Sequence, residues 1–320
     1  MAAGAMRMTH QLDLIATPDT SDVEEYRTER EWLAVRRTAL GASEAAAVLG
    51  VSPYKGPMSL FAEKLELGEP EARTEAQEWG LVMEPKMAER YVRDTGHVLR
   101  DPGRYTLRRS GAVPWMVATL DREIVQADGQ SVPAVLEMKL RSYVKPGAWE
   151  DEPPVDVLVQ VQHQLAVTGW AWAAVTVLIG YHTFRRFVVP RHEAFIAKLI
   201  PAEASFMERL RTKTPPPADG TEATRAVLRA LYPRETPGLV VDLPAEAMAW
   251  DQDLLDAKAE LARWGEIKHA AENKLRAALA DAETGVLPNG AIYTYTAAER
   301  AGYTVAPTVV RTLRRKESKA

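Results

Sequence analysis

The chain has 320 residues, of which 46% are apolar, 26% charged and 7% aromatic, and its formal net charge is −4. The length leaves room for about two domains, and the composition is typical of a globular protein and excludes a disordered or fibrous chain. The sequence contains no cysteine, which excludes a disulfide scaffold, a zinc ribbon and a cysteine-ligated iron–sulfur cluster.

The N-terminal part of the sequence has the spacing of helices. The apolar pattern predicts helices over about residues 23–37, 44–49, 58–67 and 75–95. Ser43 is a good N-cap for the second of these, and Gly96 stops the fourth. Apolar residues recur at helical spacing in the fourth helix and are expected to face the core: Trp79, Val82, Met83, Met87 and Tyr91.

The pattern then changes period and predicts strands. These are expected over residues 116–121, 134–140, 175–181 and 184–189, with a turn at 127–129 between the first two. No formal charge occurs between Asp156 and Arg185, but glutamines and a histidine near the start of that stretch indicate a helix followed by a buried strand, not a membrane span. A further helix runs to about residue 212, and the whole predicts an α/β domain.

The last third of the chain has a different character. Residues 213–220 are rich in proline and read as a linker between a domain over 1–212 and a C-terminal region over 221–320. Apolar residues between 250 and 278 recur every three or four positions, which predicts one long amphipathic helix over about 245–283. The turn Asn289-Gly290 then leads into a small β element.

Two acids and a lysine stand out near the predicted strand pair. Asp121 ends one strand, and Glu137 and Lys139, two residues apart on the next, point to the same face. If the strands pair as a hairpin, Asp121 reaches Glu137, and two carboxylates with open positions for water and phosphate suit Mg²⁺. The same three residues also occur by chance, since a solvent-facing strand often carries Glu beside Lys. On these residues alone, both readings stay open.

Several motifs occur in an order that resembles a known family. They are Trp32-x3-Arg36-x6-Ser43-Glu44-Ala45-Ala46, Trp79-Gly80-x3-Glu84-Pro85, Ala118-Thr119-Leu120-Asp121, Leu136-Glu137-Met138-Lys139 and Gln160-Val161-Gln162-His163-Gln164-Leu165. Together they resemble the YqaJ-type viral recombinases, the lambda-exonuclease group of the PD-(D/E)XK nucleases, over about residues 31–187. Leu120 and Arg122 depart from the family pattern next to Asp121 but remove no ligand.

The resemblance implies a fold and a set of site residues. The fold is a restriction-endonuclease-like α/β core, a central mixed β-sheet flanked by helices, here with a helical C-terminal extension ending in a small β element. The implied metal ligands and catalytic residues are Asp121, Glu137, the Met138 carbonyl, Lys139, Glu84 and Gln160. Arg36 and Ser43 match residues that hold the terminal 5′ phosphate of DNA. Judged alone, Arg36 is a surface charge, Ser43 a helix cap, Glu84 a solvated acid, and Gln160 with Gln164 a polar helix face.

The implied activity is a Mg²⁺-dependent 5′→3′ exonuclease on linear double-stranded DNA, with Mn²⁺ as a substitute, which leaves 3′ single-stranded tails for phage-type recombination. The alternatives are a restriction-like or structure-selective endonuclease with the same metal core, and a catalytically silent module that binds DNA ends. The expected partners are DNA ends, other copies of the chain in a ring of three or four, and a single-strand annealing protein. With no signal-peptide pattern at the N-terminus, we expect a cytoplasmic protein of a bacterium or phage-infected cell, without membrane contact.

Overall fold

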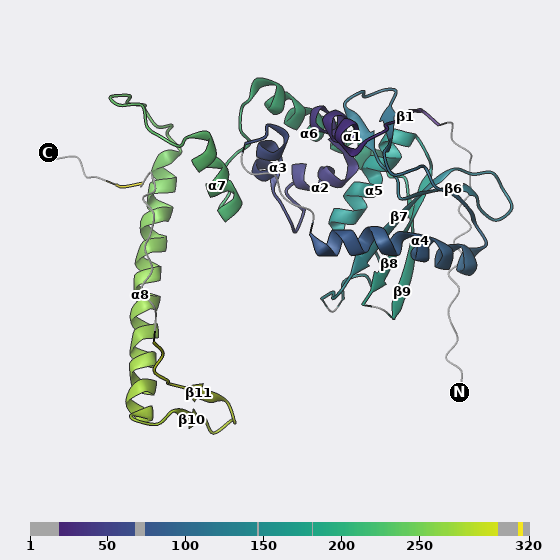
Figure 1. Cartoon of the computed structure of the whole chain (residues 1–320). Coiled ribbons are helices and arrows are strands. Elements are labelled where there is room, and N and C mark those ends of the chain that lie inside the picture. The colour runs from purple at the N-terminus through teal and green to yellow at the C-terminus, as the bar shows by residue number, and fades with distance from the viewer. Residues whose placement is uncertain (1–18, 68–73, 146, 181, 300–312, 316–320) are drawn as a thin grey trace. The chain divides into compact units, whose positions relative to one another are not determined.

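The computed structural model describes residues 19–67, 74–145, 147–180, 182–299 and 313–315. The chain divides into two compact units, the first extending to Tyr232 and the second beginning at Pro233 (Figure 1). The larger unit carries every residue predicted to form the site. The predicted linker at 213–220 lies within this larger unit.

The centre of the larger unit is a five-stranded mixed sheet with strand order β3-β6-β7-β8-β9. Its strands are β3 (Val98–Arg100), β6 (Arg122–Gln126), β7 (Ala134–Arg141), β8 (Trp172–Ile179) and β9 (Thr183–Pro190). The central strands β7 and β8 pair in parallel, whereas the other neighbours pair antiparallel. A parallel pair needs a crossover, and the chain supplies it as a helix between β7 and β8.

A second sheet of four strands lies in the same unit, with strand order β1-β4-β5-β2. It consists of β1 (Ser21–Glu25), β2 (Leu40–Gly41), β4 (Thr106–Ser110) and β5 (Met116–Ala118). The chain passes from β5 in this sheet to β6 in the larger one within a few residues, and Asp121 lies in that passage.

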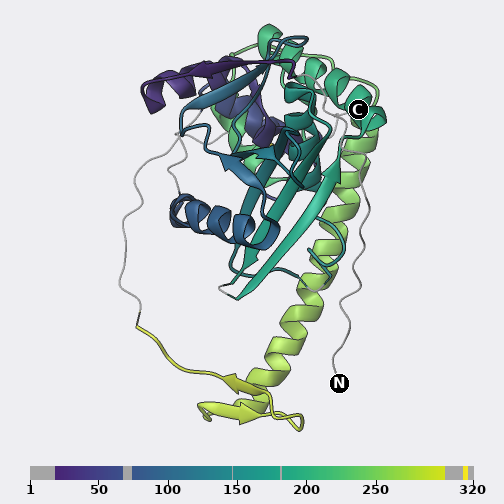
Figure 2. The ribbon, with the colours of Figure 1, turned by 90° about the vertical axis from the view of Figure 1, so that its right-hand side faces the viewer.

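Helices cover both faces of the five-stranded sheet. They are α4 (Glu75–Thr95) on one face and the crossover helix α5 (Val155–Thr168) on the other. Figure 2 shows α4 to one side of the long strands. Alternation along β7 decides which side chains each helix meets: Val135 packs in a cluster with Val157 of α5, whereas Leu136 packs with Met87 of α4. Glu137 and Lys139 therefore fall on the α5 side.

Shorter elements complete the larger unit. These are α1 (Glu29–Thr38), the 3₁₀ turn η1 (Ala42–Glu44), α2 (Ala45–Val48), α3 (Pro57–Lys64), α6 (Glu193–Thr212) and α7 (Glu222–Leu231). Although α7 follows the proline-rich segment, it packs against α3, since Val227 and Met58 belong to one buried cluster. The second unit contains α8 (Ala247–Leu279) and a hairpin of β10 (Thr284–Val286) and β11 (Ile292–Thr294).

The predicted fold is confirmed: a mixed sheet is flanked by helices, and a helical region with a small terminal β element follows. The fourth predicted helix matches α4, from the Thr74 capping box to Gly96 with its positive φ of 73°. Within the described ranges, no helix combines the length and apolar character needed to cross a bilayer.

Three local predictions are wrong. Residues 21–25 form β1, not the start of a helix, because they pair with β4, and α1 begins only after the Thr28 capping box. The first half of α4 does not face the core: Trp79 is 55% exposed and Val82 62% exposed, because contact with the sheet begins near Met83. The partner of β7 is β6, so the expected hairpin between 116–121 and 134–140 does not form.

Candidate active site

The site is built where β6 begins and β7 continues past it. The pairing of β6 with β7 starts at Arg122 opposite Leu136, so Asp121 lies beside the next stretch of β7. Its Oδ2 accepts a hydrogen bond from the Met138 N–H at 2.7 Å. A strand residue presents its N–H and C=O on the same side. The Met138 carbonyl therefore faces the Asp121 side, as the ligand prediction requires.

Glu137 is held by three donors on the α5 side of the sheet. Its Oε1 accepts from the Lys139 ammonium at 2.5 Å and from the Gln160 amide at 2.8 Å, and its Oε2 accepts from the Gln164 amide at 2.7 Å. The Lys139 ammonium also donates to the Gln160 Oε1 at 2.9 Å, which closes a ring of three side chains. Glu137 is only 2% exposed, so the alternative of a solvent-facing strand is excluded for this residue.

The electrostatics of these groups show an excess of negative charge. Burial, and then the charge of Glu137, raise the pKa of Asp121 well above its ordinary value of 3.8. Burial acts to lower the pKa of Lys139, but the charges of Glu137 and Asp121 outweigh it, so the pKa lies above 10.5 and Lys139 is an ammonium at neutral pH. A bound cation would relieve the repulsion that Asp121 experiences.

Glu84 approaches the same groups from the other face. It lies on α4, half-buried, and burial raises its pKa, while the positive charge of Arg122 opposes the shift and the negative charge of Glu137 adds to it. Among the described residues, no three His, Cys, Asp or Glu side chains are grouped closely enough to enclose a metal ion. Glu84 is therefore near the two carboxylates without forming a closed cage with them.

The donors that face this point fit a hard divalent cation. They are two carboxylates, one backbone carbonyl and one amide, all offering oxygen, and a site with so few protein ligands leaves positions for water and substrate. The residues present thus suit Mg²⁺ held by Asp121, Glu137 and the Met138 carbonyl. Nitrogen and sulfur ligands, which favour zinc or copper, do not take part in the contacts of this cluster.

The predicted phosphate residues Arg36 and Ser43 are brought together. The Arg36 Nη2 donates to the Ser43 hydroxyl at 3.1 Å, and its guanidinium lies 4.6 Å from the centre of the Trp32 ring. The prediction that Ser43 caps a helix is wrong: Ser43 lies inside η1, and α2 begins at Ala45 with Glu44 at its N-cap position. Ser43 is exposed, so its hydroxyl is available to a ligand beside Arg36.

Sequence reasoning missed two residues beneath this pair. Glu44, 6% exposed, accepts from the Gly41 N–H at 2.7 Å, pairs with the Lys64 ammonium at 2.7 Å and lies 3.6 Å from the Arg36 guanidinium. Burial acts to raise the pKa of Glu44, but the charges of Lys64 and Arg36 outweigh it, and the pKa lies below 4.5. The ammonium of Lys64 also donates to the carbonyls of Arg36 and Ala39, which ties the end of α1 to η1. Glu44 could have been found from its place directly after Ser43 in the sequence. No local pattern indicated that Lys64 belongs to the same group.

A third missed residue is Gln164. It is fully buried and bonds Glu137, one helical turn from Gln160, although a plain polar helix face explains both glutamines in the sequence. Two buried or half-buried histidines outside the predicted site have structural partners: His163 bonds Glu203 at 2.8 Å, and His97 bonds the Tyr91 hydroxyl at 2.9 Å.

The locally basic stretch between residues 100 and 145 is largely neutralised by ion pairs. Arg100 and Arg108 both bind Glu123, and the other pairs are Arg109–Glu24, Arg122–Asp101 and Lys139–Glu137. Arg108 is only 3% exposed. This stretch is therefore not a continuous free basic surface.

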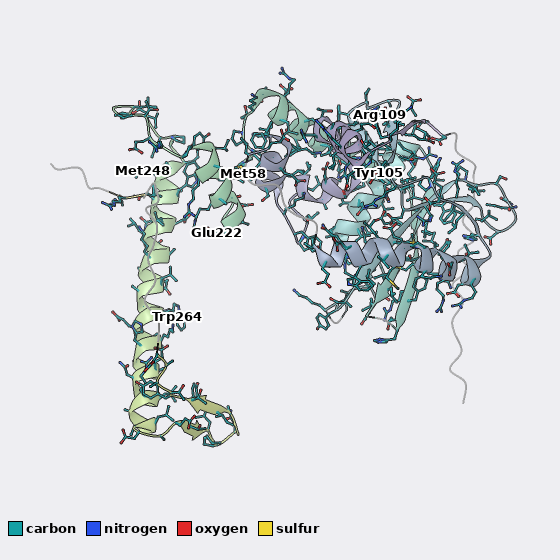
Figure 3. All side chains as sticks on the ribbon, in the orientation of Figure 1. Met58, Tyr105, Arg109, Glu222, Met248 and Trp264 are labelled. Carbon is teal, nitrogen blue, oxygen red and sulfur yellow. The ribbon has the colours of Figure 1, made fainter. Side chains whose placement is uncertain are left out.

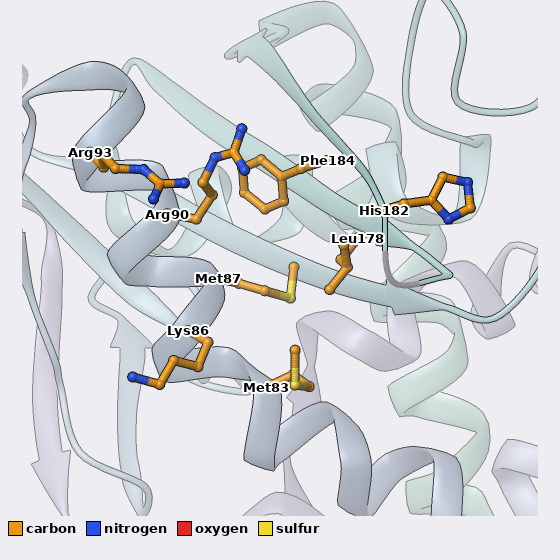
Figure 4. A pocket seen from close by; sticks show the side chains of 8 residues that line it. All are labelled: Met83, Lys86, Met87, Arg90, Arg93, Leu178, His182 and Phe184. Carbon is orange, nitrogen blue, oxygen red and sulfur yellow. The ribbon is translucent and has the colours of Figure 1, made fainter.

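A separate hollow lies on the α4 face of the sheet (Figure 4). Methionines and a phenylalanine form its floor, and basic residues of α4 stand at its rim; the lining residues are Met83, Lys86, Met87, Arg90, Arg93, Leu178, His182 and Phe184. The Arg90 guanidinium lies 5.5 Å from the centre of the Phe184 ring. None of the predicted site residues lines this hollow, so it is distinct from the carboxylate cluster.

Comparison with known proteins finds a family match within the larger unit. Residues 31–171 match the YqaJ-like viral recombinase domain. The chain is 29% identical over 264 residues to the uncharacterized protein YqaJ of Bacillus subtilis (strain 168), covering 81% of each. A 53-residue stretch is 42% identical to a protein of African swine fever virus, covering 17% of this chain and 15% of that one.

Two solved structures are similar in part. An alkaline exonuclease from Laribacter hongkongensis matches with a TM-score of 0.46 and 20% identity, covering 57% of this chain and 93% of the other. A phage-related exonuclease from Haemophilus somnus 129PT matches with a TM-score of 0.40 and 9% identity, covering 55% and 96%.

Proposed function

We propose, since residues 31–171 match the YqaJ-like viral recombinase domain, that this protein is a metal-dependent 5′→3′ exonuclease acting on linear double-stranded DNA. Its product is a 3′ single-stranded tail for phage-type recombination. The observation that supports this most is the hydrogen-bonded ring of Glu137, Lys139 and Gln160 beside Asp121. Buried carboxylates beside an ammonium and an amide are the groups that phosphodiester hydrolysis uses.

Each residue has a role that follows from its contacts. Asp121, Glu137 and the Met138 carbonyl would hold Mg²⁺ or Mn²⁺, with Glu84 nearby as a further acid. Such a cation, when bound, supplies an acidified water and a counter-charge for the phosphate. The ammonium of Lys139 places a permanent positive charge where negative charge grows on the phosphate.

The two glutamines act on position rather than on charge. Gln160 donates to Glu137 and accepts from Lys139, so its amide is held in one orientation beside the reacting groups. The Gln164 amide donates a hydrogen bond to the second oxygen of Glu137 and so holds it in place. Without these bonds, the Glu137 carboxylate has freedom to rotate away from the position that a metal ligand must keep.

Arg36 and Ser43 supply the end recognition that an exonuclease needs. A terminal phosphate carries more charge than an internal phosphodiester, and a guanidinium binds it through two parallel hydrogen bonds. The Ser43 hydroxyl adds a further donor beside Arg36. The expected partners remain DNA ends, a ring of three or four copies and a single-strand annealing protein.

Digestion of DNA with defined ends tests this function. With Mg²⁺, wild-type protein is expected to release nucleotides from linear duplex and none from covalently closed circles, and a label at the 5′ end is lost first. Asp121→Ala and Glu137→Ala abolish release while DNA binding persists. Glu84→Gln slows release, and Glu89→Gln, an exposed acid on the same helix, serves as the matched control.

Three other outcomes of this experiment would indicate a different function or a different set of metal ligands. Cleavage of closed circles indicates an endonuclease with the same metal core. Binding of ends without release, in wild-type protein with Mg²⁺, indicates a silent end-binding module. Near-normal turnover in the Asp121→Ala variant contradicts the assignment of the metal ligands.

A further inference from the structure

The second unit carries a long helix whose apolar residues face water. Helix α8 has 33 residues, and none of them is buried. Trp250 is 59% exposed, Leu261 73% and Trp264 57%, and Figure 3 shows Trp264 projecting from the ribbon. Exposed apolar patches of this kind mark interaction surfaces in native proteins.

The spacing of these residues is that of a coiled coil. When Trp250 is placed at heptad position d, position a holds Leu254, Leu261, Lys268 and Leu275, and position d holds Trp250, Ala257, Trp264, Ala271 and Ala278. The repeat continues over four heptads, which is long enough to indicate a coiled coil. Lys268 is the single charged residue at these nine positions.

The flanking positions separate this pattern from a helix that packs on a domain surface. A helix covering a globular core adds apolar residues at e or g, whereas a coiled coil places charges there. Here e and g hold Asp251, Lys258, Gly265, Glu272, Leu279, Asp253, Glu260, Ile267 and Lys274, of which six are charged and two, Ile267 and Leu279, are apolar. The apolar stripe is therefore narrow, and a second helix of the same kind covers it best.

The charges on α8 favour an antiparallel partner. Residues 247–263 carry four acids and two bases, whereas residues 264–279 carry two acids and three bases. Two copies running in opposite directions bring the acidic half of each against the basic half of the other. A parallel pair instead places Lys268 against its own copy in the core, where two like charges repel.

In the antiparallel register, each core layer is formed by one a and one d residue. Leu254 then lies opposite Ala271 of the second copy and Ala257 opposite Lys268, whereas the large pairs Leu261–Trp264 and Trp250–Leu275 form the other layers. At the flanks, Asp253 lies opposite Lys274 of the second copy, and Asp251, which pairs with Arg315 of its own chain, lies opposite Glu272. Trp250, Leu254, Leu261 and Trp264 are 59%, 38%, 73% and 57% exposed. Covering these parts on both copies buries on the order of 1,000 Å², the minimum expected of a biological interface.

We propose that α8 pairs with α8 of a second copy of this chain as an antiparallel two-stranded coiled coil. This contact lies outside the YqaJ-like domain, and it does not depend on the nuclease function. It joins two copies through their C-terminal units whatever the YqaJ-like domains do with one another.

Cysteine cross-linking of the full chain tests both the pairing and its direction, because the natural sequence has no cysteine. Under mild oxidation, a mixture of Ala257→Cys and Lys268→Cys chains is expected to form a disulfide-linked dimer, and Ala257→Cys alone is not. A control with Ala259→Cys, on the opposite face of α8, stays uncross-linked. Dimers from Ala257→Cys alone would show a parallel pair and overturn the proposal.

Sedimentation of the same chain gives an independent measurement. Leu261→Asp is expected to weaken self-association by about 100-fold, whereas Ala259→Asp leaves it unchanged. Activity on linear duplex is measured in parallel, and both variants keep the basal rate if the nuclease proposal holds. Equal association of wild-type and Leu261→Asp chains, with no cross-linking at 257 and 268, would overturn the coiled coil without touching the nuclease assignment.

Discussion

Arg36 gives the sharpest test of end recognition. In the proposed role of Arg36, Arg36→Ala removes a bidentate contact to the terminal phosphate, and a hydrogen bond to a charged group contributes about 1.5–3 kcal/mol. The preference for a 5′-phosphorylated end over a 5′-hydroxyl end is therefore expected to fall by roughly 10- to 150-fold in kcat/KM. Only this ratio is diagnostic, because a general loss of DNA affinity slows both substrates equally.

Two further variants make the measurement specific. Arg37 is the next residue of α1 and pairs with Glu66, away from Ser43, so Arg37→Ala is the matched control and should leave the ratio unchanged. Gly41→Ala adds a methyl group whose carbon lies 3.0 Å from the Arg36 Nη2, so the guanidinium must shift by a few tenths of an ångström. We expect Gly41→Ala to give an intermediate ratio.

The assay compares initial rates on two duplexes that differ only in the 5′ group, for wild type and the three variants. The reasoning fails if Arg36→Ala keeps the wild-type ratio, since the phosphate is then recognised elsewhere. It fails also if Arg37→Ala lowers the ratio as much, because the effect would then be one of total positive charge.

Three other predictions concern buried or half-buried polar groups: Lys64, Gln164 and His97. Lys64→Met leaves the Glu44 carboxylate buried without its ammonium and is expected to lower the free energy of unfolding by about 3–5 kcal/mol in urea titration; a change below 1 kcal/mol would contradict the buried pair. Gln164→Leu frees one oxygen of Glu137, so the Mg²⁺ concentration for half-maximal rate should rise about 10- to 100-fold while DNA binding stays constant, and an unchanged metal dependence would remove Gln164 from the site. Burial lowers the pKa of His97 below 6.5, so the folded state favours the neutral imidazole. The contribution of His97 to the free energy of unfolding is complete above pH 6.5 and is lost as the pH falls through the lowered pKa. The His97→Gln variant should therefore lose less stability than wild type between pH 7 and 5. If the free energy of unfolding falls equally with pH in the two proteins, the protonation of His97 is not coupled to folding.

The sequence predicts best those parts of the fold that local signals define. Helix α4 begins at a capping box and ends at a glycine with positive φ, and both signals lie within a few residues of the boundary. Strand β1 has no such signal, because its state depends on pairing with β4, about 85 residues further along the chain. A residue pattern indicates which faces of a segment are apolar but not which distant strand the segment pairs with. The helix predicted from residue 23 was therefore wrong over residues 23–25, which belong to β1.

The same distinction applies to the site. Alternation along a strand placed Glu137 and Lys139 on one face, and the structure has them in direct contact. Gln164 and Lys64 are different: each is one polar residue on a helix, and only the packing of that helix against η1 or β7 decides that it is buried against an acid. No pattern within either helix distinguishes such a residue from one that faces solvent.

Helix α5 connects the two halves of the proposed site. It supplies Gln160 and Gln164 to the carboxylate cluster, and its apolar face shares a buried cluster with Ala42 of η1, next to Ser43. Ser43 and the carboxylates are thus carried by elements that pack against the same helix. If Arg36 and Ser43 seat the terminal phosphate, we expect the position of α5 to influence the distance from that phosphate to the cleaved bond. A substitution that shifts α5 without touching either set of residues should therefore change the length of the released product rather than only its rate.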